Sequence, residues 1–139
     1  MTKFMMYLLC CVLLVFTFGC GGKYSDAVDL QEDFISLAGD YVAAMDSADS
    51  ADKVAAAMND YAAGLEDMAP RVREINEKYP ELSNPEQQPE QFKQTAQEHE
   101  AVMQKVGNSF MKAMPYMGDP DVRQAQQRIT LAMQSMEGK

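Results

Sequence analysis

Histidine and methionine are the residue types in this chain that could hold a haem or a soft metal ion. His99 is the only histidine, and nine of the twelve methionines lie beyond residue 20. One histidine and one methionine on facing helices can supply the two axial ligands of haem iron. However, His99 lies between Glu98 and Glu100, and the chain has no C-x-x-C-H motif for covalent haem attachment. We therefore expect no haem and no other cofactor.

The C-terminal half is rich in methionine, which raises the possibility of Cu(I) binding. Thioether sulfur is a soft ligand that suits this ion. The chain has no closely spaced M-x-x-M-x-M run, however, and methionines at helical spacing more often fill gaps in a core. A flexible surface for protein partners or for an apolar ligand is the second interpretation. The residues concerned are Met103, Met111, Met114, Met117, Met133 and Met136.

Acidic and hydroxyl residues form no catalytic or calcium-binding pattern. Asp46, Asp49 and Asp52 recur at every third position, but they lack the central glycine and the terminal glutamate of a calcium loop. Acids at this position are typical of the start of a helix, where they favour the helix dipole. The chain also lacks a G-x-S-x-G motif and a glycine-rich phosphate loop. We therefore predict a protein that is not an enzyme and has no metal site.

The N-terminus carries an apolar run from Phe4 to Phe18, followed by Gly19, Cys20 and Gly21. At 15 residues, the run has the length of a signal-peptide core and is shorter than a membrane-spanning helix. It resembles the signal peptide and lipobox of bacterial lipoproteins. The resemblance implies cleavage before Cys20 and acylation of this cysteine, for example with palmitate. Residues 1–19 would then be a helical signal peptide, and residues 20–25 the lipidated cysteine and a short tether.

The same resemblance predicts where the protein works. The body would be held at a membrane of the cell envelope, facing the periplasm, and Gly21 in place of an aspartate favours the outer membrane. The formal net charge is −9, and removal of Lys3 with the signal makes it about −10. Because such a charge repels phosphate groups, we expect no nucleic-acid partner and membrane contact only through the lipid.

Residues 26–139 read as one helical domain. Apolar residues recur at spacings of three and four and predict helices over about 26–47, 50–79, 86 or 90 to 114, and from 120 onward. Ser25-Asp26, Ser50 or Asp49, and Asp119-Pro120 are expected to begin helices, and Tyr79-Pro80 to end one. Pro70 falls within the second helix, off its apolar stripe, and predicts a bend.

Four amphipathic helices with short connectors favour an all-α antiparallel bundle, in which the longest helix, the second, extends past its neighbours. The segment from Tyr61 to Leu82 is similar to stretches of uncharacterised bacterial helical proteins, which implies no activity. The favoured function is structural or protein-partner binding, including binding to a second copy of the chain. The alternative is a small apolar ligand or haem held between helices near Tyr61, His99 and Phe110.

Overall fold

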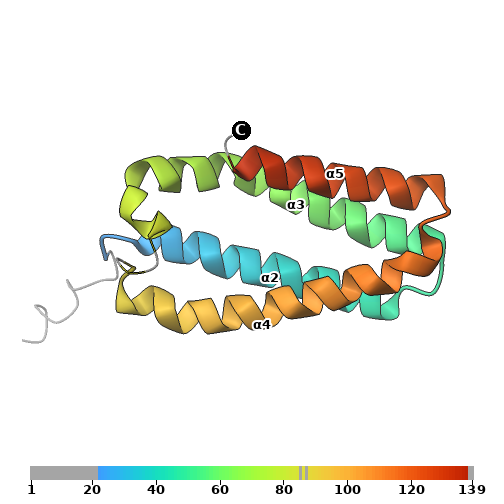
Figure 1. The fold of residues 1–139 in the computed structure, drawn as a ribbon, viewed down its shortest axis with the longest axis horizontal. Helices are drawn as coiled ribbons and strands as arrows, with labels where there is room; N and C mark the ends of the chain where they lie inside the picture. The colour runs from blue at the N-terminus through green and yellow to red at the C-terminus, as the bar shows by residue number, and fades with distance from the viewer. Residues whose placement is uncertain (1–21, 85, 87, 138–139) are drawn as a thin grey trace, which may run out of the picture.

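The computed structural model describes residues 22–84, 86 and 88–137, and within them it is an all-α bundle of four long helices (Figure 1). The four helices are α2 (Ser25–Ser47), α3 (Ala51–Lys78), α4 (Glu90–Ala113) and α5 (Pro120–Met136). Two short 3₁₀ helices, η1 (Pro80–Ser83) and η3 (Met114–Tyr116), lie in the connectors. The predicted fold class is confirmed. Cys20 and the predicted signal peptide lie outside the described residues.

Local capping signals set most of the helix ends. The Ser50 side chain accepts a hydrogen bond from the Lys53 amide, and Asp119 accepts one from the Asp121 amide at 2.9 Å. The predicted cap at Ser25-Asp26 is wrong. Tyr24 occupies the cap position of α2 without a capping side-chain bond, and Asp26 instead accepts from the adjacent Ala27 amide inside the first turn. Backbone bonds from the first turn to Tyr24 and the residues before it take the place of a side-chain cap.

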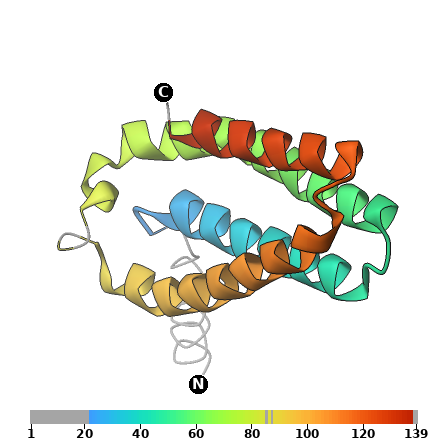
Figure 2. The same ribbon diagram turned by 45° about the vertical axis from the view of Figure 1, so that its right-hand side comes forward.

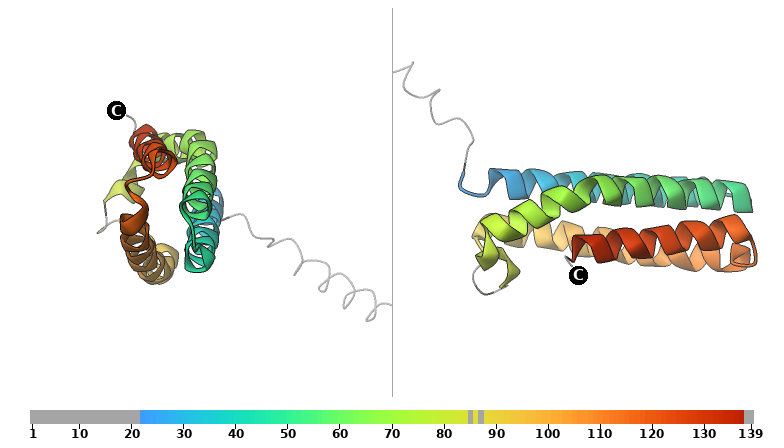
Figure 3. Two further views of the ribbon diagram at one scale, coloured as in Figure 1. Left: turned by 90° about the vertical axis from the view of Figure 1, so that its right-hand side faces the viewer. Right: turned by 90° about the horizontal axis from the view of Figure 1, so that it is seen from above.

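Helices that follow one another in the chain run in opposite directions, but two of the lateral pairs are parallel. Figures 1 and 2 show α2 and α4 running side by side in one direction, and α3 and α5 in the other. Ion pairs connect helices in both the antiparallel and the parallel pairs. Arg71 of α3 bonds to Asp33 of α2 across the antiparallel pair, and Lys112 of α4 bonds to Asp46 of α2 across the parallel pair. The end-on view in Figure 3 shows the four helices around a common centre.

The main core lies in this centre, and α3 supplies much of it. Met58, Tyr61 and Leu65 of α3 are at most 1% exposed and pack with residues of the other three helices. Small residues allow the helices to approach closely. Alanines account for many of the buried positions, which are Ala38, Ala55, Ala57, Ala62, Ala113, Ala125 and Ala132. An apolar stripe predicts such a core, because only one face of each helix can be withdrawn from water.

The helix α3 is continuous through Pro70 and is longer than its parallel neighbour α5. It has 28 residues against 17. Figure 3 shows its second half changing direction, as expected for a proline that removes one internal hydrogen bond. Arg128 of α5 bonds to Asn59 and Glu66 of α3, and α5 ends about two turns later at Met136. The last turns of α3 therefore extend beyond α5, at the end of the bundle where α2 begins (Figure 1).

Gly64 tests how closely α2 and α3 approach each other, and Gly107 of α4 serves as the comparison. A Cβ atom on Gly64 would overlap the end of the Leu37 side chain, whereas one on Gly107 of α4 would meet nothing within 4 Å. We expect Gly107→Ala to raise the free energy of unfolding by about 1 kcal/mol through helix propensity. Gly64→Ala must displace Leu37, so its stability in urea unfolding should lie about 1–3 kcal/mol below that of Gly107→Ala. Equal gains from both substitutions would contradict this packing.

Candidate ligand-binding cavity

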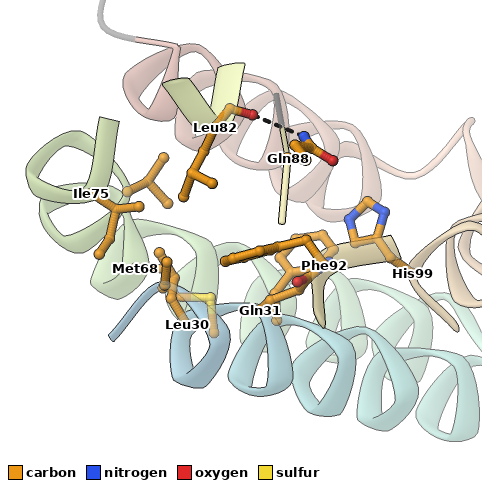
Figure 4. Close-up of a pocket in the computed structure, with 11 residues that line it drawn as sticks. Leu30, Gln31, Met68, Ile75, Leu82, Gln88, Phe92 and His99 are labelled. Carbon is orange, nitrogen blue, oxygen red and sulfur yellow. Dashed lines mark hydrogen bonds between the residues drawn. The ribbon is translucent and has the colours of Figure 1, made fainter. Parts of the chain in front are cut away.

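An apolar cavity of about 410 Å³ occupies the end of the bundle that α5 does not reach. Its volume falls in the range of small-molecule sites, which is roughly 300–1,000 Å³. Three helices, η1 and the connector before α4 form its walls (Figure 4). The lining residues are Ala27, Leu30, Gln31 and Phe34 of α2, Met68, Val72 and Ile75 of α3, Leu82 of η1, Gln88, and Phe92 and His99 of α4.

The connector between α3 and α4 folds across this end because prolines and one side-chain hydrogen bond shape it. Pro80 begins η1 directly after α3 ends at Lys78. The Gln88 amide then donates to the Leu82 carbonyl at 2.8 Å, which holds η1 toward the start of α4 (Figure 4). Leu82 is thereby placed in the cavity wall opposite α2.

A small aromatic cluster adjoins the cavity and shares Phe92 with it. Tyr79 and Phe92 are buried, and both contact the ring of Tyr24, with ring centroids 4.9 Å and 5.9 Å from it. The Tyr24 hydroxyl and the Lys23 ammonium both donate to Glu81 at 2.9 Å. The ammonium of Lys23 is the main reason that the pKa of Glu81 is lowered to about 2. Lys23 and Tyr24, which the sequence assigned to the tether, are thus bonded to the bundle.

Two polar side chains of the cavity have different surroundings. The Gln31 Oε1 atom is buried and has no hydrogen-bond partner. His99 is half-buried, and its ring centroid lies 5.2 Å from that of Phe34, tilted by 31°. Figure 4 shows Gln31 coming from α2, with Phe92 and His99 coming from α4. Because the Gln31 oxygen has almost no accessible surface, it is packed against other side chains and does not face the open part of the cavity.

The structure separates the three residues that the sequence grouped as a ligand site. His99 lines the cavity. Tyr61 stacks on Tyr41 with centroids 4.6 Å apart, and Phe110 lies 5.6 Å from Tyr41. Tyr61 and Phe110 therefore meet around Tyr41 in the main core and do not share the cavity with His99. Tyr41 and Tyr61 also border a separate hollow of about 290 Å³ between α2 and α3.

Sequence reasoning missed most of the cavity, including Gln31, Leu82 and Gln88. The available signal was the length of the second helix, which predicts an end without a partner helix. The C-terminal methionines only partly fit the core-filling prediction. Met117, Met133 and Met136 pack partly against the core, whereas Met111 and Met114 are 69% and 62% exposed. Both lie where α4 ends, next to the turn toward α5.

The described part of the chain offers no grouping of three or more His, Cys, Asp or Glu side chains that could hold a metal ion. None of its helices has the length and apolar character of a bilayer-spanning helix. Comparison with protein-family models, with curated proteins and with solved structures finds no match. The function is therefore argued from the cavity and its surroundings.

Proposed function

We propose that the protein is a non-enzymatic binding module of the cell envelope that holds a small apolar ligand in the cavity between α2, α3, η1 and α4. The observation that supports this proposal is an apolar hollow of about 410 Å³ at an end of the bundle where α3 extends beyond α5. Among the two functions that the sequence left open, this feature favours the ligand-binding one. Protein-partner binding stays a prediction.

The cavity is suited to binding and not to chemical conversion of its ligand. The described residues of its walls are mostly branched aliphatic and aromatic, and their polar members are Gln31, Gln88 and His99. Among the described residues that line the cavity, none carries a carboxylate that could act with His99 as an acid–base pair. Burial of apolar surface would supply the affinity, at roughly 25 cal/mol for each Å² removed from water.

The N-terminal resemblance supports the envelope location. Acylation of Cys20 would attach the lipid a few residues before Tyr24, whose ring packs on Phe92 of the cavity wall. The cavity would then lie at the membrane-proximal end of the bundle (Figure 1). The intact mass of the protein extracted from its own membrane tests cleavage and acylation together, and an unmodified full-length mass would contradict this location.

Filling the cavity provides the test of ligand binding. Val72 is half-buried and lines the cavity, so Val72→Phe places a larger ring inside it. We expect this variant to bind an environment-sensitive naphthalene dye about tenfold more weakly than the parent chain. The measurement is a fluorescence titration of the full-length chain kept in solution by an amphipathic polymer, with the polymer alone as the blank.

The matched control is Ala101→Phe, which adds the same ring at an exposed position of α4. It should bind the dye as the parent does. Circular dichroism of both variants establishes that the bundle is intact. Equal dye binding by the parent and by Val72→Phe would show that the cavity is not a ligand site.

A further inference from the structure

The end of α4 and the adjoining η3 lie at the end of the bundle opposite the cavity, and they carry three methionines (Figure 1). These are Met111, Met114 and Met117, which stand at every third position in the order M-x-x-M-x-x-M. From their spacing and exposure we infer that their thioether sulfur atoms form a site for a Cu(I) ion. This site is separate from the cavity and does not depend on the proposed ligand-binding function.

Exposure shows that two of these methionines do not serve to fill the core. Met111 and Met114 are 69% and 62% exposed, and among the described residues the only other large hydrophobic side chain with comparable exposure is Leu131. Solvent can therefore deliver an ion to the side chains of Met111 and Met114. Met117 is half-buried and packs against the main core, which restricts where its sulfur can lie.

Helical geometry places the three side chains next to one another. In an α-helix, residues three positions apart have Cβ atoms about 5–6 Å from each other. The Met114 amide donates to the Met111 carbonyl, and the Met117 amide donates to the Met114 carbonyl at 3.2 Å. This second turn is a 3₁₀ helix, in which residues three positions apart are eclipsed. Met114 thus lies between the other two, and the flexible methionine side chains can bring their sulfur atoms to one ion.

Thioether sulfur selects a soft ion. Methionine suits Cu(I), whereas carboxylate and carbonyl oxygen suit Mg²⁺ and Ca²⁺. The position also favours a cation, because the last turn of a helix carries the negative end of its dipole and the chain has a formal net charge of −9. The neighbouring Lys112 is paired with Asp46, which reduces its repulsion of a bound ion.

A competition titration tests the site. Because cysteine thiolates also bind Cu(I), Cys10, Cys11 and Cys20 are replaced by serine in the full-length chain, which is kept in solution by an amphipathic polymer. The chain competes for Cu(I), kept reduced by ascorbate under argon, with the coloured chelator bicinchoninate, and polymer alone is the blank. We expect Met111→Leu together with Met114→Leu to weaken Cu(I) binding at least about tenfold.

The matched control is Met133→Leu together with Met136→Leu, which removes two methionines at the same spacing from α5, where both pack against the core. This control should bind Cu(I) as the parent does, and circular dichroism establishes that both double variants are folded. Binding by the parent no greater than the blank, unchanged affinity in the α4 variant, or an equal loss in both variants would overturn the site. A loss caused by His99→Asn instead would assign the ion to the cavity and would overturn it as well.

Discussion

Replacing Leu65 by alanine should lower the free energy of unfolding by about 2–5 kcal/mol. Leu65 is 0% exposed and belongs to the core cluster that joins α3 to α2, α4 and α5. Truncation removes apolar contacts with these helices and leaves a cavity that the surrounding side chains fill only in part. Since domains of this size have a total stability of about 5–15 kcal/mol, the loss should be visible as a large shift of the urea midpoint.

Leu131→Ala provides the matched control for Leu65→Ala. Leu131 lies on α5 with 64% of its surface exposed, so the same truncation should change the stability by no more than about 0.5 kcal/mol. The two variants differ in burial and not in chemistry. A large loss in Leu131→Ala would show that the outer face of α5 is covered, and would support the predicted protein partner or second copy of the chain.

Raising the pH above 10 should destabilise the protein through Tyr61 and Tyr41. Burial raises the pKa of Tyr61 from 10.0 to about 12, and burial together with Tyr61 raises the pKa of Tyr41 further. The folded state therefore keeps these phenols protonated at a pH where the unfolded chain releases the protons. The contribution is complete below pH 10 and is lost as the pH rises through the folded pKa.

For Tyr61 alone, the difference between the unfolded and folded pKa corresponds to about 3 kcal/mol of stability, of which about 2 kcal/mol is lost between pH 10 and pH 12. Urea midpoints measured across this pH range give the loss, and tyrosinate absorbance follows the ionisation. In Tyr61→Phe the alkaline loss should be smaller. At neutral pH this variant should be at least as stable as the parent, because the Tyr61 hydroxyl is buried without a hydrogen-bond partner.

The control for the tyrosine experiment is Tyr116→Phe in η3, which removes a hydroxyl outside the Tyr41–Tyr61 stack and should keep the alkaline loss of the parent. A marked loss of stability in Tyr61→Phe at neutral pH would show that its hydroxyl has a partner, such as a bound water or a ligand in the adjacent hollow.

The helices and their ends could be read from the sequence because their causes are local. The side chains of Ser50 and Asp119 accept hydrogen bonds from backbone amides two or three residues later. Pro80 ends the helix before it because its ring removes the amide donor and disfavours helical angles at Tyr79. The first helix begins without such a cap, and there the predicted capping side chain was wrong. The apolar stripes identified the buried faces, since a spacing of three and four residues places side chains on one side of a helix.

Which helix packs against which of these buried faces could be learned only from the tertiary structure. An apolar stripe indicates that one face of a helix is buried. The spacing of its residues is the same whichever neighbouring helix covers that face. The sequence therefore predicted that His99, Tyr61 and Phe110 could meet, whereas the fold places His99 beside Phe34 and the other two around Tyr41. His99 and Phe110 are separated by about 16 Å along α4, and the parallel packing of α2 places Phe34 beside the first and Tyr41 beside the second.

By itself, the sequence determined an acidic all-α body, its helix boundaries and the side of each helix that avoids water. It also carries the resemblance from which acylation of Cys20 and an envelope location are predicted. Only the tertiary structure decided that an apolar cavity lies at the end that α5 does not reach, and that residues of α2, α3, η1 and α4 form its walls. The physical reason is that capping and periodicity act within a few residues, whereas a cavity and an unsatisfied polar atom depend on side chains brought together from distant parts of the chain.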